Sequence, residues 1–145
     1  MDFLTAMKIS SSGLSAQRKR METIASNMAN SETTRTAEGG PYRRKDVVIT
    51  ALPLEDQFGM HLNQELEEKL KEVLVTDIVE DQNEPRMVFN PGHPDANDLG
   101  YVAMPNIDVV SEMVNMMTAT RSYEANVTAI NATKVMAQRA IDLGR

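Results

Sequence analysis

The sequence predicts an α+β protein in which long N- and C-terminal helices pair as a coiled coil and flank a small β-rich module. Two long stretches near the chain ends lack proline and repeat apolar side chains at helical spacing. All six prolines and five of the seven glycines lie between these stretches. We therefore expect two helical parts, residues 1–34 and 106–145, and a β-rich module over residues 35–105.

The first helix is expected over residues 3–29. Its apolar stripe recurs every seven residues, at Met7, Leu14, Met21 and Met28. Polar side chains interrupt this stripe, and Gly13 weakens the helix by roughly 1 kcal/mol relative to alanine. The helix ends in IASNMAN (residues 24–30), whose small and amide-bearing side chains bury little by themselves. This segment therefore needs a surface to pack against.

The middle of the chain is rich in turn residues and contains short β-branched runs. These runs predict strands over residues 46–52, 73–79, 86–90 and 101–104, with the last two paired. Residues 62–72 fit either a short helix or the charged start of a strand. A module of this size is near the lower limit for independent folding.

The second helix is expected over residues 107–143. Its seam alternates steps of four and three through Val109, Met113, Met116, Thr120, Tyr123, Val127, Ile130, Lys134, Ala137 and Ile141. Asn106 or Asp108 caps the start and Gly144 marks the stop. The alternative for such a stripe is the core face of an ordinary helical bundle. Antiparallel pairing of the two helices would bring the chain ends together and place the β-rich module at the far end.

Composition excludes several functional classes. Aromatic residues make up only 4% of the chain and there are 11 methionines, so a single large, rigid core is not expected. The chain has no cysteine, and no apolar run reaches the roughly 18 residues that span a bilayer. The N-terminus lacks the features of a cleaved signal peptide. Residues 31–106 hold fifteen acidic and seven basic side chains, which argues against general nucleic-acid binding.

No catalytic, cofactor-binding or metal-binding constellation is found in the sequence. His61 and His93 are far apart and are interpreted as surface histidines. The segment 95–100 resembles part of a calcium loop but lacks the required ligands at its later positions, so we interpret it as a turn. We therefore expect a protein that is not an enzyme and that uses no cofactor.

Two basic clusters have competing interpretations. Residues 17–21 are either a solvated helix face or the best candidate for DNA contact. Residues 41–45, PYRRK, either dock an acidic surface of a neighbour or balance the local charge.

Several longer motifs together resemble the flagellar basal-body rod family. The N-terminal part matches in SGLSAQRKRM (residues 12–21) and IASNMAN, followed by Thr33-Thr34. The C-terminal part matches in Gly100-Tyr101, Pro105-Asn106, VVSEMVNM (residues 109–116) and RSYEAN (residues 121–126). The stretch 41–44 and the short middle indicate a proximal-rod member. The resemblance covers nearly the whole chain.

The resemblance implies a structural subunit of the bacterial flagellar rod. It implies a helical inner tube domain made from both termini, an outer β-rich module, and type III export without signal cleavage. The expected location is the basal body, in the periplasmic span of the rod. The expected partners are other copies of the chain, neighbouring rod proteins, the export apparatus and a rod-base adaptor, with no nucleic acid and no direct membrane insertion.

We expect the two helices to carry the subunit interface. On the first helix the candidates are Leu14, Met21, Ile24, Asn27, Met28 and Asn30, with the two asparagines either bonding across subunits or capping the helix end. On the second helix they are Met113, Met116, Arg121, Tyr123, Glu124, Val127 and Ile130, with Arg121 and Glu124 pairing either locally or with another subunit. The main alternative function is a cytoplasmic helical-hairpin adaptor, followed by a DNA-binding regulator and a membrane-surface helix.

Overall fold

The computed structural model describes residues 3–53 and 71–144. This part of the chain forms two long helices, α1 (Phe3–Ala29) and α3 (Val109–Leu143). Its strands are β1 (Lys45–Pro53), β2 (Lys71–Glu80), β3 (Arg86–Phe89) and β4 (Tyr101–Met104). The predicted α+β class is confirmed. Most of the ambiguous segment 62–72 lies outside the described residues, and its last two residues begin β2.

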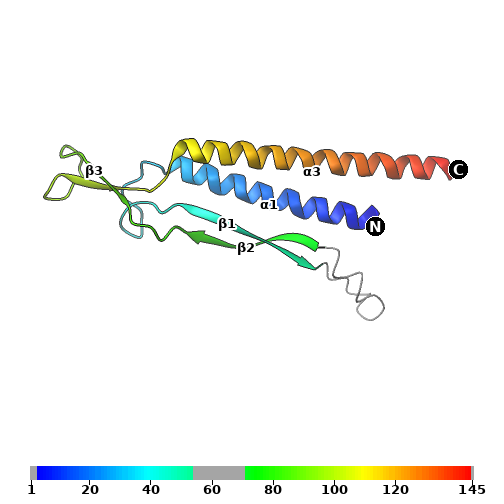
Figure 1. Ribbon diagram of the computed structural model, residues 1–145, viewed down its shortest axis with the longest axis horizontal. Coiled ribbons are helices and arrows are strands. Elements are labelled where there is room, and N and C mark those ends of the chain that lie inside the picture. Colours follow the sequence, from blue (N-terminus) through cyan, green and yellow to red (C-terminus); the bar gives the residue numbers. More distant parts are fainter. Residues whose placement is uncertain (1–2, 54–70, 145) are drawn as a thin grey trace.

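The two helices lie side by side and antiparallel, so the start of α1 and the end of α3 meet at the same end of an elongated molecule (Figure 1). Asp108 is the N-cap of α3, and its carboxylate accepts a hydrogen bond from the Val110 N–H at 3.1 Å. At the other end Gly144 donates its N–H to the carbonyl of Ile141. Both predicted ends of α3 are therefore confirmed.

The side of α3 that is covered differs in part from the predicted seam. Seven of the ten predicted seam positions are partly buried, namely Val109, Met116, Thr120, Tyr123, Val127, Ile130 and Ala137. Beside the seam, Glu112 and Ala119 are buried and Asn126 and Thr133 are partly buried, each one residue before a predicted position. Met113, which the prediction placed in the seam, is 49% exposed.

Side-chain size explains why the covered side of α3 extends beyond the seam. A Cβ on Gly13 would lie only 3.1 Å from the Asn126 side-chain nitrogen, so the absence of a side chain there lets α3 come close to α1. Ala16 and Ala119 are each 2% exposed, so small side chains occupy the covered faces of both helices. The apolar pattern points to large residues, whereas close approach of two helices selects small ones.

The four strands form two separate antiparallel hairpins. In the first, β1 pairs with β2 from Lys45↔Glu80 to Pro53↔Lys71. In the second, β3 pairs with β4 from Arg86↔Met104 to Phe89↔Tyr101. All four predicted strands are confirmed, including the predicted pairing of the last two.

The placement of the first hairpin corrects the expectation that the whole β-rich module lies at the far end. The β1–β2 hairpin runs back along α1, so α1 lies between α3 and this hairpin (Figure 1). The hydroxyl of Ser12 accepts a hydrogen bond from the Val73 N–H at 3.1 Å, which joins the middle of α1 to the start of β2. Of the two hairpins, only β3–β4 extends past the C-terminal end of α1 and the N-terminal end of α3 (Figure 1). The reason is that α1 has two faces to cover and α3 covers only one of them.

The core is small. The buried apolar residues among those described are Ala16, Ile24, Val47, Val102, Ile107 and Ala119. The accessible surface is 10740 Å², whereas a compact monomer of this mass would expose about 7400 Å². The chain therefore leaves an unusually large surface free for contacts with other molecules.

Candidate interaction surfaces and the polar junction

A buried polar cluster ties the end of α1 to the start of β1 and to the first turn of α3. We call this cluster, made of Asn27, Tyr42, Arg44, Lys45 and Glu112, the polar junction. Asn27 is 0% exposed, and its amide nitrogen donates to the Lys45 carbonyl at 2.8 Å and to Glu112 Oε2 at 3.1 Å. Its oxygen accepts from the Lys45 N–H at 2.9 Å and from the Tyr42 hydroxyl at 3.2 Å. All four hydrogen-bonding positions of the amide are therefore used within the chain.

The second half of the junction is an ion pair. The Arg44 guanidinium donates from Nε to Glu112 Oε1 at 2.9 Å, and its Nη2 lies 2.9 Å from the same oxygen in an ion pair. Glu112 is only 2% exposed, so its carboxylate depends on Arg44 and Asn27 for compensation. Burial by itself lowers the pKa of Arg44, but the hydrogen bond and charge of Glu112 outweigh it and raise that pKa above its ordinary value. Arg44 thus stays charged opposite its partner.

The basic cluster at residues 41–45 is thereby explained largely inside the chain. Arg44 neutralises Glu112, and Lys45 forms an ion pair with Glu80 across the hairpin at 3.2 Å. Of the two predicted roles, the structure provides local charge balance. Glu112 was not predicted as a functional residue. Its signal in the sequence is a lone acidic residue in an apolar stretch of helix, and such residues usually face solvent.

The candidate interface residues on α1 are placed as follows. Leu14, Met21 and Met28 are partly buried, and Ile24 is 5% exposed. Met21 faces α3, where the Thr120 hydroxyl lies 3.6 Å from its sulfur. Asn30 donates to the Ser26 carbonyl at 2.9 Å and accepts from the Thr33 hydroxyl at 3.1 Å, so it secures the end of α1.

The candidates on α3 divide into two groups. Met116, Tyr123, Val127 and Ile130 are partly buried. Met113, Arg121 and Glu124 are exposed, and no ion pair joins Arg121 to Glu124 among the pairs between described residues.

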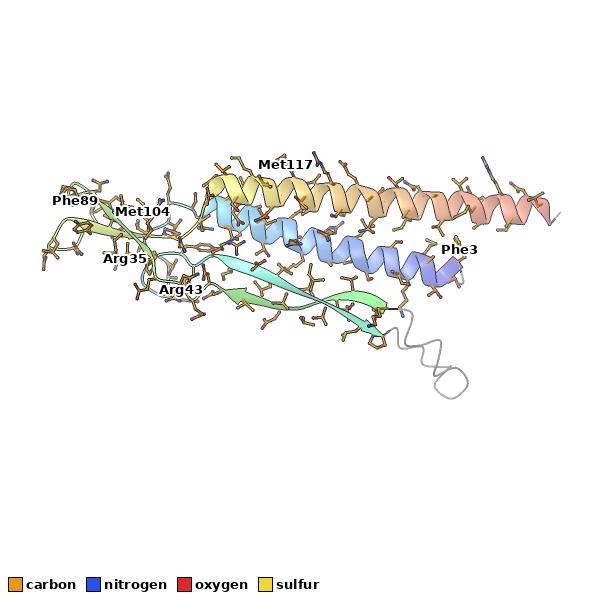
Figure 2. The ribbon with its side chains drawn as sticks, viewed as in Figure 1. Phe3, Arg35, Arg43, Phe89, Met104 and Met117 are labelled. Atoms are coloured by element: carbon orange, nitrogen blue, oxygen red, sulfur yellow. The ribbon has the colours of Figure 1, made fainter. Side chains whose placement is uncertain are left out.

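Met113 belongs instead to an apolar row on the far side of α3. We call Val110, Met113, Val114 and Met117 the outer stripe; their exposed fractions are 68%, 49%, 52% and 55%. Met117 projects from the face of α3 that is turned away from α1 (Figure 2). The spacing i, i+3, i+4, i+7 of this row was the available sequence signal for a second apolar face.

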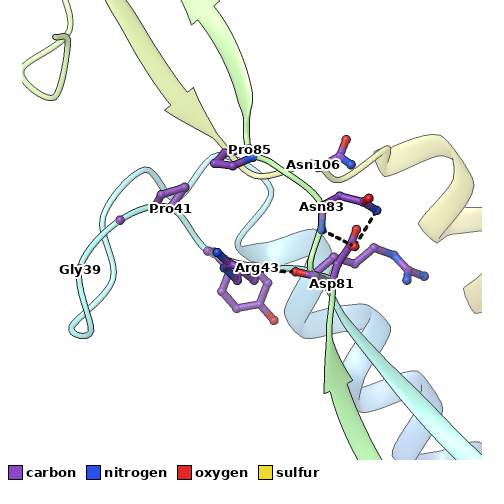
Figure 3. Close-up of a pocket in the computed structure, with 10 residues that line it drawn as sticks. Gly39, Pro41, Arg43, Asp81, Asn83, Pro85 and Asn106 are labelled. Carbon is purple, nitrogen blue, oxygen red and sulfur yellow. Dashed lines mark hydrogen bonds between the residues drawn. The ribbon is translucent and has the colours of Figure 1, made fainter.

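A pocket of about 150 Å³ lies beside the polar junction, between the loop before β1 and the loop after β2 (Figure 3). Asp81 accepts from the backbone N–H of Asn83 at 3.0 Å and from its side-chain amide at 2.7 Å. These two bonds hold the pKa of Asp81 below its ordinary value, and the backbone bond contributes the larger share. The lining residues of this pocket include one carboxylate, that of Asp81, and no histidine.

Replacing Asn83 by alanine is expected to raise the pKa of Asp81 toward its ordinary value, because the side-chain donor is lost while the backbone donor remains. The folded-state pKa of Asp81 lies below the unfolded one, so the contribution of these bonds to stability is present at neutral pH and is lost as the pH falls through the folded value. An NMR titration of the Asp81 carboxyl carbon measures the shift. Gln82→Ala serves as the control, and an unchanged titration in Asn83→Ala would contradict the assignment.

Other sequence expectations concern metal and membrane contacts. His61 lies outside the described residues, while His93 accepts a hydrogen bond from the Asp95 N–H. The turn interpretation of residues 95–100 is confirmed, because Asn97 Oδ1 accepts from the N–H groups of Leu99 and Tyr101. Over residues 3–53 and 71–144, no cluster of three potential ligands could hold a metal ion. Neither described helix combines the length and apolar character needed to cross a membrane.

Comparison with known proteins identifies the family. The profile described as "Flagella basal body rod protein" matches residues 7–35, and "Flagellar basal body rod FlgEFG protein C-terminal" matches residues 99–143. The flagellar basal-body rod protein FlgC of Bacillus subtilis is 42% identical, with 97% of each chain aligned. The FlgC proteins of Yersinia enterocolitica and Salmonella typhimurium are 41% and 40% identical, with all of each chain aligned. The chain belongs to the FlgC family of flagellar basal-body rod proteins.

The FlgC family match extends over every element described above. The two profile matches include Asn27 and Glu112, the two ends of the polar junction, but not Arg44. The alignments with whole FlgC chains also take in both hairpins, so the relatives share the region that contains Arg44.

Proposed function

We propose that this chain is a structural, non-enzymatic subunit of the flagellar basal-body rod that assembles through its terminal helices into a tubular drive shaft. Membership of the FlgC family supports the rod assignment. The observation that carries the assembly role is the outer stripe, an apolar row on a helix whose other side is already covered by α1. Contiguous exposed apolar rows of this kind mark protein–protein contact sites.

The surface area supports the same role. The chain exposes 10740 Å², which is about 3000 Å² more than a compact monomer of its mass. A stable protein–protein interface buries about 800 Å² on each partner. The excess is therefore large enough for contacts with several neighbours, as a subunit inside a tube requires.

The finer parts of the proposal follow from the family. The chain is exported through the flagellar type III apparatus without cleavage and is placed in the periplasmic span of the proximal rod. Its partners are other copies of itself, neighbouring rod proteins and a rod-base adaptor. The predicted interface residues Arg121 and Glu124 are exposed, which leaves both available to another subunit.

Replacing Met113 and Met117 together by aspartate is expected to abolish swimming. Two carboxylates on the outer stripe would have to be desolvated at the subunit contact, which opposes assembly without touching the α1–α3 seam. Soft-agar motility of a deletion strain complemented with the variant measures the effect. We expect at least a tenfold loss of motile cells and an unchanged circular dichroism spectrum of the purified chain.

The matched control replaces the same two methionines by leucine, which keeps the stripe apolar and should preserve swimming. Normal swimming of the aspartate variant would remove the outer stripe from the assembly surface. If the wild-type chain is a stable, folded monomer and is not incorporated into rods, the adaptor interpretation is favoured.

A further inference from the structure

The β3–β4 hairpin is held to the rest of the protein by few contacts. We call residues 86–104, which hold β3, β4 and the turns between them, the arm. Among the described elements, neither helix and neither strand of the β1–β2 hairpin packs extensively against β3 or β4. The arm extends past the helices at one end of the molecule (Figure 1). Its position therefore depends on the loops at its base.

Apolar packing fixes the base of the arm. Val102 is 0% exposed, and Pro105 and Ile107, which follow β4, are also buried. Apolar contacts of this kind are non-directional, so they hold a segment in place without fixing its angle. The buried base therefore acts as a pivot for the arm.

A single polar contact holds the arm away from this pivot. The Thr34 hydroxyl, in the loop after α1, donates to Asp95 Oδ2 at 2.8 Å. Of all the hydrogen bonds between described residues, this is the one that joins the arm to the rest of the chain. A surface hollow of about 320 Å³ lies beside it, lined among others by Thr34, Pro41, Asp95 and Ala103. The hollow leaves room for the arm to turn when the bond is broken.

A histidine holds Asp95 in turn. The Asp95 N–H donates to His93 Nδ1 at 3.1 Å, and Asp95 Oδ2 lies 3.9 Å from the same nitrogen. The His93 ring accepts this bond only when it is neutral, with a lone pair on Nδ1. The charged residues that line the hollow are Arg35 and Asp95, and Asp98 lies in the next turn of the arm. The His93 side chain is 27% exposed, so protons reach it from solvent.

Protonation of His93 changes both interactions of Asp95. Nδ1 then carries a proton, so it no longer accepts from the Asp95 N–H and becomes a donor toward the Asp95 carboxylate. The carboxylate is attracted to the ring and away from the Thr34 hydroxyl. A hydroxyl–carboxylate bond is charge-assisted, so its loss changes the ratio of held to released arms by about tenfold.

We propose that Thr34, His93 and Asp95 form a pH-dependent latch, which sets the angle of the arm and opens when His93 is protonated. The arm carries exposed apolar side chains, among them Phe89 at 63% and Leu99 at 75%. The latch therefore controls the direction in which this apolar surface points. It goes beyond the rod assignment and does not depend on it, because all of its parts lie in one chain.

Distances between two spin labels, measured by pulsed electron spin resonance on the full-length chain, test the latch. The chain has no cysteine, so Leu99→Cys on the arm and Ser111→Cys on α3 supply two exposed labelling sites. A strand of four residues is about 13 Å long, so a turn of about 20° moves its end by roughly 5 Å. We expect one narrow distance distribution at about pH 8, and at about pH 5 a second population of comparable size displaced by that amount.

Three variants assign the response to the latch. Thr34→Val removes the hydroxyl donor and keeps the side-chain shape, so the second population should be present at both pH values. His93→Asn keeps an acceptor oxygen near the position of Nδ1 but does not titrate, so the arm should stay held at both. The matched control is Thr36→Val, which removes a hydroxyl that bonds only to the Gly40 carbonyl of its own loop. It should respond to pH as the wild type does.

Three results would overturn the latch. These are an unchanged distance distribution of the wild type between the two pH values, a pH response that persists in His93→Asn, and a held arm in Thr34→Val at about pH 8. Each would leave the rod assignment intact, since the measurement is made on the isolated chain.

NMR gives a second readout that needs no label. Between the same two pH values, the His93 ring protons and the Asp95 amide should titrate with one common midpoint, because the ring nitrogen is the acceptor of that amide. The Asp95 amide should not titrate in His93→Asn. An Asp95 amide that keeps its chemical shift while the His93 ring titrates would contradict the proposed contact.

Discussion

Replacing Arg44 by methionine is expected to lower the free energy of unfolding by about 3 kcal/mol. The methionine fills similar space but leaves Glu112, which is 2% exposed, with only the Asn27 amide as a partner. A buried carboxylate without its counter-ion carries the full cost of lost hydration. Urea denaturation followed by circular dichroism measures the difference.

Two further variants make this prediction specific. Arg43→Met removes a neighbouring, exposed guanidinium whose one described hydrogen bond is a 3.4 Å contact with the Asp81 carbonyl, so it should change stability by less than about 0.5 kcal/mol. Arg44→Met combined with Glu112→Leu removes both charges and should recover at least about 1 kcal/mol of the loss. If the single variant is as stable as the wild type, the ion pair does not hold the junction together.

Replacing Asn27 by aspartate is expected to cost about 3 kcal/mol at neutral pH. The change removes both N–H donors, so the Lys45 carbonyl loses its partner, and it places a second carboxylate about 3.1 Å from Glu112 in a fully buried position. The new acid would have a folded-state pKa above its unfolded value, because burial and the charge of Glu112 disfavour ionisation. The loss of stability should therefore grow as the pH rises from about 4 and shrink in acid.

Thermal unfolding of this variant between pH 4 and pH 8 tests both the size and the sign. Asn30→Asp is the matched control, since Asn30 lies three residues further along and bonds only locally at the helix end. It should cost less than about 1 kcal/mol. If the loss of stability in Asn27→Asp does not depend on pH, the new carboxylate does not remain buried beside Glu112 in the polar junction.

Local signals were sufficient to predict the elements of the fold. The helix ends follow from capping chemistry at Asp108 and Gly144, and the strands follow from β-branched runs bounded by turn residues. Such local signals could not predict how elements distant in sequence pack against each other. The apolar pattern placed Met113 in the seam, whereas the neighbouring Glu112 is buried and Met113 belongs to the outer stripe.

The polar junction illustrates the same limit for the site. Asn27 could be singled out because it lies in a recognisable motif. Its partner Glu112 is 85 residues away, and its other partners are the backbone of Lys45 and the hydroxyl of Tyr42. A buried hydrogen-bond network depends on which segments meet in space, and sequence periodicity carries no information about that. The placement of β1–β2 along α1 was missed for the same reason.

The pairing of α1 with α3 joins the first and last parts of the chain. Asn27 and Glu112 are 85 residues apart, and Met21 and Thr120 are 99 residues apart. Contacts of such high sequence separation slow folding, because a long loop must close before any of them forms. A chain that emerges from a ribosome or a channel with its N-terminus first cannot complete these contacts until its final residues are free. The topology therefore delays completion of the α1–α3 contacts until the whole chain is out.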